Sequence, residues 1–248
     1  MSHGFIWYEL MTSDPDAAAK FYGAVIGWTA HGTGQPGMDY RQLKMGDSFV
    51  GGLMAMAEMP PMWVGYISVD DVDAAIVAIK AAGGAEHMPA RDIPGVGRMA
   101  MVSDPQGAIF YVMAAIGDGP ATSFAPGKVG HGGWHELHTT DWSAGFDFYK
   151  TQFGWEKVHA MDMGPMGTYL QFNFGEGDFV GGMMNDSQAP RPHWQFVFNV
   201  EDVTAAKSRI EAHGGETLRG PEQVPTGAWI VQAKDPQGAV FVVVGPKA

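Results

Sequence analysis

The chain lacks several features that would tie it to large classes of proteins. It contains no cysteine, which excludes disulfides, thiolate metal ligands and thiol nucleophiles. It has no run of lysine or arginine, and its formal net charge is −12 at pH 7. Nucleic acids and anionic membranes both require a basic surface, so neither is an expected partner.

Segments that would direct the chain to or across a membrane are also missing from the sequence. No apolar run approaches the roughly 20 residues that span a bilayer. The opening residues, MSHGFIWYELMTSD, lack the basic flank and the clean apolar segment of a signal peptide. We therefore expect a cytoplasmic protein. Its 248 residues, 46% hydrophobic and 17% charged, suit a globular core of one large domain or two ordinary ones.

An internal repeat dominates what is present. Residues 9–28, ELMTSDPDAAAKFYGAVIGW, align without a gap with residues 136–155, ELHTTDWSAGFDFYKTQFGW. The motif DPQGA recurs at Asp104 and Asp235, and FVGG recurs at Phe49 and Phe179. The offset between copies grows slowly from 127 to 131 residues, which indicates small loop insertions in the second half. The two halves are duplicates.

Each half divides again into two modules of the pattern β-α-β-β-β. Residues 5–11 alternate as a strand does, Asp14-Pro15 begins a helix, and Gly27 ends it. Further strands are expected near 28–33, 39–45, 48–56, 98–103 and 108–114. The predicted first domain is 1–116 (modules 1–57 and 60–116), and the second is 133–248 (modules 133–188 and 190–246). The Gly- and Pro-rich segment 117–132 is the predicted linker.

These motifs resemble the vicinal oxygen chelate superfamily, which includes glyoxalase I, extradiol dioxygenases and bleomycin-resistance proteins. The marks are the ELxTxD and FYxxxxGW segments that begin each half, the VDDV and VEDV segments followed by a glycine pair, and the DPQG turns. The resemblance covers nearly the whole chain. It implies an α+β fold in which four βαβββ modules pair into two domains whose mixed sheets curl around a cup.

The positions at which this family binds its metal carry unsuitable residues here. By resemblance, the first-strand and last-strand ligand positions fall on Trp7, Val64, Tyr111, Trp134, Gln195 and Val242, and the remaining acidic position falls near Gly51–Gly52 and Gly181–Gly182. A catalytic metal needs about three converging His or carboxylate ligands, whereas Gln195 and Tyr111 would be weak ones. We expect no family-type metal site and no cofactor, as in the metal-free members of the family.

Alternation along the strands predicts which side chains would line the cups instead. The expected ligand-binding residues are Trp7, Tyr40, Gln42, Tyr66, Tyr111, Trp134, Tyr169, Gln171 and Gln195. The FY pairs of the helices are interpreted as helix-to-sheet packing, and the DPQG motifs as tight hairpin turns. Six other histidines are expected at the surface: His3, His31, His87, His131, His159 and His213.

The candidate catalytic residues are Glu9, Glu136, His138 and His193. Each glutamate would face an aromatic cup and act as a general base, or would hold the sheet together by pairing with a neighbour. The two histidines occur only in the second half. There His193 is expected opposite Glu136, as part of a Glu–His pair or of a displaced two-His, one-carboxylate metal site. Ordinary surface or core histidines are the other interpretation.

Two functions are compatible with these residues. The first is an enzyme acting on a small, partly apolar organic molecule by acid–base chemistry; the resemblance suggests a glyoxalase-like lyase, isomerase or hydroxylase. The second is a non-catalytic protein that sequesters such a molecule. A metal-dependent lyase or dioxygenase with a displaced site is a further alternative. The expected partner is a small molecule, and the chain is expected to be a monomer or homodimer.

Overall fold

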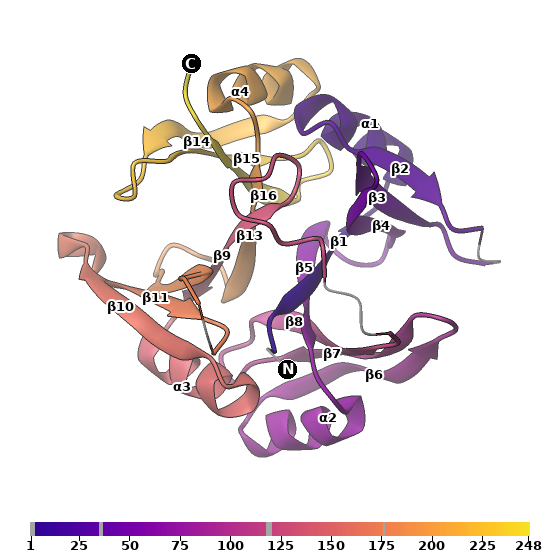
Figure 1. Ribbon diagram of the computed structural model, residues 1–248, viewed down its shortest axis with the longest axis vertical. Helices are drawn as coiled ribbons and strands as arrows, with labels where there is room; N and C mark the ends of the chain where they lie inside the picture. Colours follow the sequence, from indigo (N-terminus) through magenta and orange to yellow (C-terminus); the bar gives the residue numbers. More distant parts are fainter. Residues whose placement is uncertain (1–2, 35–36, 118–120, 176) are drawn as a thin grey trace. The chain divides into compact units, whose positions relative to one another are not determined.

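The computed structural model describes residues 3–34, 37–117, 121–175 and 177–248 (Figure 1). The described strands form two eight-stranded mixed sheets, which confirms the predicted α+β class. The strand order is β2-β3-β4-β1-β5-β8-β7-β6 in one sheet and β10-β11-β12-β9-β13-β16-β15-β14 in the other. None of the helices in the described part of the chain is long and apolar enough to cross a membrane.

The first half of the chain contains the two predicted modules. The first comprises β1 (Phe5–Thr12), α1 (Pro15–Val25), β2 (Thr29–Gly32), β3 (Tyr40–Met45) and β4 (Ser48–Ala55). The second comprises β5 (Met62–Ser68), α2 (Val72–Ala81), β6 (Ala85–Ile93), β7 (Gly97–Ser103) and β8 (Ile109–Ala115). In each sheet, the first strand of a module is parallel to the last, as β1 is to β4.

The second half repeats this order. The third module comprises β9 (Gly132–Thr139), α3 (Trp142–Phe153), β10 (Glu156–Asp162), β11 (Thr168–Asn173) and β12 (Gly181–Asn185). The fourth comprises β13 (His193–Asn199), α4 (Val203–Ala212), β14 (Glu216–Gln223), β15 (Trp229–Lys234) and β16 (Val240–Gly245). The helices pack on the strands that follow them, as α2 does on β6 and β7 (Figure 1).

Each of the helices α1 to α4 begins after an aspartate whose carboxylate accepts backbone N–H groups of the first turn. Asp14 accepts the N–H of Ala17, and Asp141 accepts those of Ser143 and Ala144. Asp71 and Asp202 cap α2 and α4 in the same way. Such a cap contributes about 1 kcal/mol, because the first N–H groups of a helix have no partner within it.

Contacts between residues group the modules differently from the order of the repeats. One compact unit, here unit one, consists of Met1–Ile6, Gly65–Pro120 and His135–Trp194, and so holds most of the second and third modules. The other, unit two, consists of Trp7–Val64, Ala121–Trp134 and Gln195–Ala248, and holds most of the first and fourth. The predicted domains 1–116 and 133–248 follow the repeat and stay a prediction.

A buried chain of hydrogen bonds joins the modules within unit one. The indole N–H of Trp194 donates to the hydroxyl of Tyr149 at 2.9 Å, and this hydroxyl donates to the carboxylate of Asp104 at 3.1 Å. Tyr149 belongs to an FY pair and Asp104 to a DPQG turn, where its carboxylate also accepts backbone N–H groups of the turn. The FY and DPQG motifs are therefore hydrogen-bonded to each other across modules. The sequence suggests helix packing for one motif and a turn for the other, without a contact between them.

Unit two contains the same arrangement in its own modules. Trp63 donates to the hydroxyl of Tyr22 at 2.9 Å, and Tyr22 donates to Asp235 at 3.1 Å. Both tyrosines are fully buried among aromatic rings, so a lone hydroxyl or carboxylate there would be costly. We call these two chains of hydrogen bonds the Trp–Tyr–Asp locks. Each lock joins a motif from one half of the chain to a motif from the other.

Candidate functional site

The candidate site lies on β9 and β12 of unit one. Glu136 and His138 are two residues apart on β9, so their side chains share a face of the sheet. Strand β12 runs parallel to β9 and places Gly182 beside Glu136. Asp186 follows directly after β12 and approaches the same face. The sheet therefore brings two carboxylates and an imidazole together.

His138 is held between the two carboxylates. Its Nε2 lies 2.9 Å from Oε1 of Glu136, and its Nδ1 lies 2.8 Å from Oδ2 of Asp186. A carboxylate can only accept a hydrogen bond, so Nδ1 donates to Asp186, and the carboxylate of Glu136 beside Nε2 favours a second proton on the ring. Burial lowers the pKa of His138, but the two carboxylates outweigh burial and raise this pKa above its ordinary value. The two carboxylates therefore favour the cationic form of His138.

Both carboxylates are further stabilised by other donors. The hydroxyl of Tyr169 on β11 donates to Oε2 of Glu136 at 2.7 Å. Asp186 accepts the backbone N–H groups of Gln188 and Ala189. Partial burial raises the pKa of Asp186. These N–H groups and His138 lower it by more than burial raises it, so the net pKa lies below the usual value. Tyr169, Glu136, His138 and Asp186 form one continuous chain of contacts, here called the polar chain.

The ring of Tyr169 occupies the space beside Gly182. A Cβ atom on Gly182 would collide with the Tyr169 hydroxyl and with its ring carbon. By resemblance, an acidic metal ligand would stand near this glycine. The position therefore carries no side chain, and the tyrosine of the neighbouring strand fills the volume that a carboxylate would need.

His193, at the start of β13, stacks on His138 instead of lying against Glu136. The ring centroids are 4.9 Å apart and the ring planes are inclined by 7°. Its Nδ1 lies 3.1 Å from the carbonyl oxygen of Arg191. Partial burial lowers the pKa of His193, and the charge on His138 lowers it further. The pKa values of the two histidines are thus shifted in opposite directions although their rings are in contact.

The first repeat retains the strands and the glutamate of this site but not its histidines or its aspartate. Glu9 is buried beside Gly52, and a Cβ on Gly52 would collide with Tyr40. The hydroxyl of Tyr40 accepts a hydrogen bond of 3.0 Å from the indole N–H of Trp7. At the positions equivalent to His138, Asp186 and His193, the first repeat has methionine each time: Met11, Met56 and Met62. The polar chain is thus specific to the second repeat.

The other predicted ligand-binding residues occupy varied environments. Tyr66 and Tyr111 are buried and stack on each other at 4.3 Å, so they belong to the core of unit one. Gln195 is buried and accepts a hydrogen bond of 2.6 Å from Gln232. Gln171 is also buried, beside Gly182, whereas Trp7, Tyr40, Gln42, Trp134 and Tyr169 are half-buried.

Besides His193, two residues differ from what the sequence indicates. Asp186 was not anticipated, because it lies just beyond its strand; the signal in the sequence was the replacement of Met56 by an acid in the second repeat. His131 was expected at the surface but is fully buried, with its Nδ1 3.0 Å from the carbonyl oxygen of Val129. Its place in the Gly-rich linker suggested exposure, and the linker packs more closely than its composition predicts.

The residues at the family's metal positions do not fit a divalent ion. Indole, phenol, amide and aliphatic groups stand at the strand positions, and glycines screened by tyrosines stand at the acidic ones. Within the described ranges, no group of three or more His, Asp or Glu side chains is arranged to hold a metal ion. The carboxylates of the polar chain are directed at His138.

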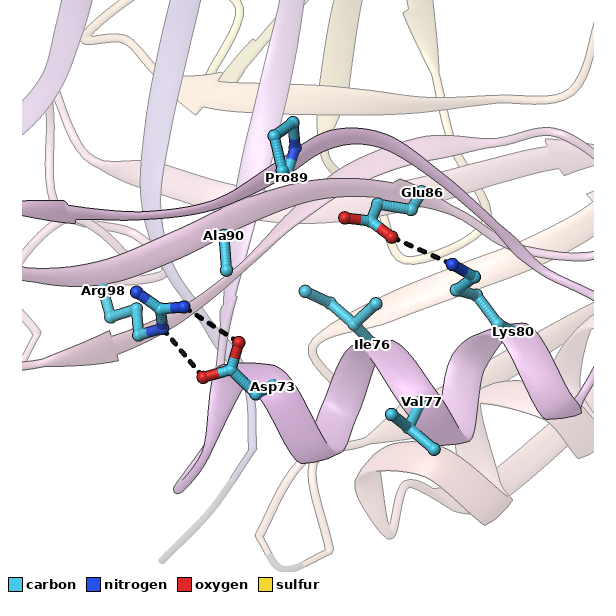
Figure 2. A pocket seen from close by; sticks show the side chains of 8 residues that line it. All are labelled: Asp73, Ile76, Val77, Lys80, Glu86, Pro89, Ala90 and Arg98. Atoms are coloured by element: carbon cyan, nitrogen blue, oxygen red, sulfur yellow. Dashed lines mark hydrogen bonds and ion pairs between the residues drawn. The ribbon is translucent and has the colours of Figure 1, made fainter.

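A shallow depression elsewhere in unit one is separate in character from the polar chain. It lies between α2 and β6, and Figure 2 shows Ile76 of the helix and Ala90 of the strand pointing toward each other, whereas Val77 points away from the strand. Its charges are paired with each other, because Arg98 binds Asp73 at 2.9 Å and Lys80 binds Glu86 at 3.0 Å. No histidine lines it, and none of the predicted site residues belongs to it.

Comparison with known proteins places both halves in one family. The model of the Glyoxalase/Bleomycin resistance protein/Dioxygenase superfamily matches residues 4–111 and again 132–243. CFP32 of Mycobacterium tuberculosis, whose name describes it as a glyoxylase, is 32% identical over 97% of this chain and 94% of its own. The anthracycline biosynthesis protein DnrV of Streptomyces peucetius is 31% identical over 96% of this chain and 91% of its own.

Solved structures with low sequence identity share the fold. The Mn(II)-bound glyoxalase from Novosphingobium aromaticivorans matches with a TM-score of 0.70 and 16% identity, over 98% of this chain and 82% of that one. Homoprotocatechuate 2,3-dioxygenase from Brevibacterium fuscum matches with a TM-score of 0.70 and 16% identity, over 100% and 82%. The chain therefore belongs to the glyoxalase/bleomycin resistance protein/dioxygenase superfamily, as its repeated modules and motifs predicted.

Proposed function

We propose that this chain is a glyoxalase-like enzyme that acts on a small, partly apolar organic molecule at the polar chain of the second repeat. The chemistry is acid–base catalysis that uses the chain's own side chains in place of the family metal. The observation that carries the proposal is the linked set Tyr169, Glu136, His138 and Asp186. The first repeat has kept Tyr40 and Glu9 but has methionines where the histidines and Asp186 stand.

The geometry of the polar chain suits proton transfer. Polar groups linked at 2.7–2.9 Å strengthen each other's interactions in a partly dry environment. Glu136 keeps about a fifth of its side chain accessible, so a bound molecule can reach it. A purely structural ion pair would be replaced by packed apolar residues at little cost, as the methionines of the first repeat illustrate.

The names of the relatives support a small organic ligand. One relative is named as a glyoxylase and another as an anthracycline biosynthesis protein, and each aligns with nearly the whole of this chain. The half-buried aromatic ring of Tyr169 in the polar chain fits an aromatic or partly apolar molecule. Cytoplasmic location and a monomeric or homodimeric state remain predictions from the sequence.

The test is a ligand screen followed by one isosteric substitution. Thermal shift with methylglyoxal, simple phenols and hydroxyanthraquinones identifies binders, and chromatography of the reaction mixtures identifies turnover. For a converted ligand, Glu136→Gln is expected to lower kcat at least about a hundredfold while ligand affinity changes little. The matched change in the first repeat is Glu9→Gln. If Glu9→Gln abolishes turnover and Glu136→Gln does not, the active site lies in the first repeat and not in the second.

A non-catalytic binding protein is the second candidate. The aromatic and aliphatic side chains at the family's metal positions favour it, because they create a surface that holds an apolar molecule without activating it. The same screen separates the two functions. Ligands that bind tightly and are recovered unchanged from both the parent chain and Glu136→Gln would support sequestration and reject the enzyme.

A further inference from the structure

The two stacked histidines of unit one differ in what their ring nitrogens bind. Both nitrogens of His138 face carboxylates, at 2.9 Å and 2.8 Å. His193 uses only Nδ1, which lies 3.1 Å from the carbonyl oxygen of Arg191. A carbonyl can only accept, so Nδ1 of His193 carries the hydrogen and Nε2 of the neutral ring carries a lone pair. Within the described part of the chain, this Nε2 makes no hydrogen bond, and the ring is half-buried.

The charges around His193 keep its ring neutral. His138 lies stacked on it from β9, Asp186 approaches from the end of β12, and Arg191 lies two residues before it. The pKa of His193 is lowered by burial and by the positive charge of His138, with a smaller lowering from Arg191. The Arg191 carbonyl and Asp186 act in the opposite direction and do not outweigh them. A second imidazolium 4.9 Å from the first would be repelled by it.

The carboxylates of the polar chain are less available than this nitrogen. Glu136 is engaged by His138 through one oxygen and by Tyr169 through the other. Asp186 is engaged by His138 and by two backbone N–H groups. Two carboxylates and one imidazolium also leave the group with one net negative charge, which disfavours an anionic ligand.

We propose that Nε2 of His193 is the hydrogen-bond and proton acceptor for the ligand, while His138, held between two carboxylates, positions the His193 ring by stacking on it. This proposal rests on the proposed function and specifies its substrate class: a neutral molecule that presents a hydroxyl group, such as a phenol, and not a carboxylate. The proton moves from the ligand oxygen to Nε2, and the negative charge left on that oxygen offsets the repulsion between the two imidazolium rings. It returns when the ring reverts to its neutral form.

Nuclear magnetic resonance of the full chain tests the proton placement without any ligand. With ¹⁵N-labelled histidine, His138 is expected to stay doubly protonated at pH 7, and His193 to be neutral with its hydrogen on Nδ1. His138→Phe keeps a ring against His193 but removes the charge, so the titration midpoint of His193 is expected to rise. A neutral His138, or a His193 midpoint that does not rise in His138→Phe, would overturn the proposal.

Three matched probes test the ligand class: 2-naphthol, 2-methoxynaphthalene and 2-naphthoate. Calorimetry is expected to show binding of the naphthol at least about tenfold tighter than that of the ether or the anion. His193→Phe retains a stacked ring and is expected to abolish this preference. Equal binding of the three probes, no binding of the naphthol, or a preference that survives His193→Phe would each overturn the ligand class.

The outcomes separate this inference from the proposed function. If His193→Phe loses the preference for the hydroxyl probe and the parent chain turns over no ligand, the proposed ligand class stands and the proposed enzyme activity is rejected. Turnover that depends on Glu136 but is unchanged in rate and pH profile by His193→Phe would retain the enzyme and reject His193 as acceptor. If His193→Phe does not fold, the ¹⁵N titration of the unsubstituted chain decides the proton placement.

Discussion

At the scale of single residues, two glycines occupy the positions where the family would carry acidic ligands. Gly182 and Gly52 each face a tyrosine whose hydroxyl would collide with any Cβ atom at the glycine. In the second repeat this tyrosine bonds to Glu136, and in the first it bonds to Trp7. Absence of a side chain is therefore what allows Tyr169 to reach the polar chain.

Gly182→Ala tests this dependence. The added methyl group is expected to displace Tyr169 from Glu136 and to destabilise the chain by about 1–3 kcal/mol through overpacking. Gly52→Ala introduces the same collision with Tyr40 and is the control. Urea unfolding should show comparable losses for both, whereas only Gly182→Ala should reduce ligand affinity or turnover. An equal functional effect of the two substitutions would contradict a site confined to the second repeat.

Another single residue, His135, should make stability depend on pH. Burial lowers the pKa of His135 from 6.5 to about 3, although the carbonyl of Val180 accepts its Nδ1–H. The folded chain keeps this ring neutral, whereas the unfolded chain takes up a proton below pH 6.5. Its contribution to stability is thus complete above pH 6.5 and is lost progressively as pH falls from 6.5 towards 3.

The expected slope is up to about 1.4 kcal/mol per pH unit within that window. His135→Phe keeps an aromatic ring against Phe5, with which His135 stacks at 4.6 Å, and removes the titration. Urea unfolding between pH 4 and pH 8 should therefore give a flatter profile for His135→Phe than for the parent chain. Parallel profiles would show that the pKa of His135 is the same in the folded and unfolded chain.

At the scale of elements, the Trp–Tyr–Asp locks hold the modules of each compact unit together. Burial raises the pKa of Asp104 and Asp235, and the tyrosine hydroxyl and the turn's N–H groups oppose that rise. Each lock thus satisfies a carboxylate, a hydroxyl and an indole N–H that would otherwise be buried without partners.

Tyr149→Phe removes one hydroxyl from the lock of unit one. The indole N–H of Trp194 and an oxygen of Asp104 both lose a partner, so the free energy of unfolding is expected to fall by about 1–3 kcal/mol. Tyr22→Phe is the equivalent change in unit two and should cost a similar amount. The double mutant Tyr149→Phe/Asp104→Asn, unfolded in urea beside both single mutants, measures the coupling. A coupling energy near zero would contradict a lock.

The elements also show how much the sequence could predict. The helices were located by their Asp caps and terminal glycines, and most strands by alternation bounded by turns. Strand β6 was not located, since Pro89 stands in its middle and proline usually interrupts a strand. Because β6 is the last strand of its sheet, one side of it needs no hydrogen bonds, and the proline is tolerated there.

The site could be predicted only in part. Glu136, His138 and His193 were identified from strand parity and from the asymmetry between the repeats. Their mutual geometry was not, because parity determines the face of a strand but not the rotamers. Asp186 lies beyond its strand, where parity does not apply. The contact between FY and DPQG motifs joins residues more than 40 positions apart, a distance over which local patterns carry no information.

At the scale of the whole molecule, the chain has the family fold, and the positions that by resemblance would hold the family metal carry indole, phenol, amide and aliphatic groups. Treatment with EDTA is therefore expected to leave both the Tm and the ligand affinity unchanged. Elemental analysis of the purified chain should find Zn, Fe, Ni and Mn well below one ion per chain. A Tm that falls after EDTA and recovers with Mn²⁺ would establish a displaced metal site and reject acid–base chemistry by side chains alone.

The division of the locks between distant parts of the chain has a consequence for synthesis on the ribosome. Unit one can close its lock once residue 194 has emerged, since Asp104 and Tyr149 both precede it. Tyr22 must wait for Asp235, which is translated 213 residues later. Helix α1 of the nascent polypeptide therefore stays without its aspartate partner while the next 213 residues are translated, and chaperones have that interval in which to bind it.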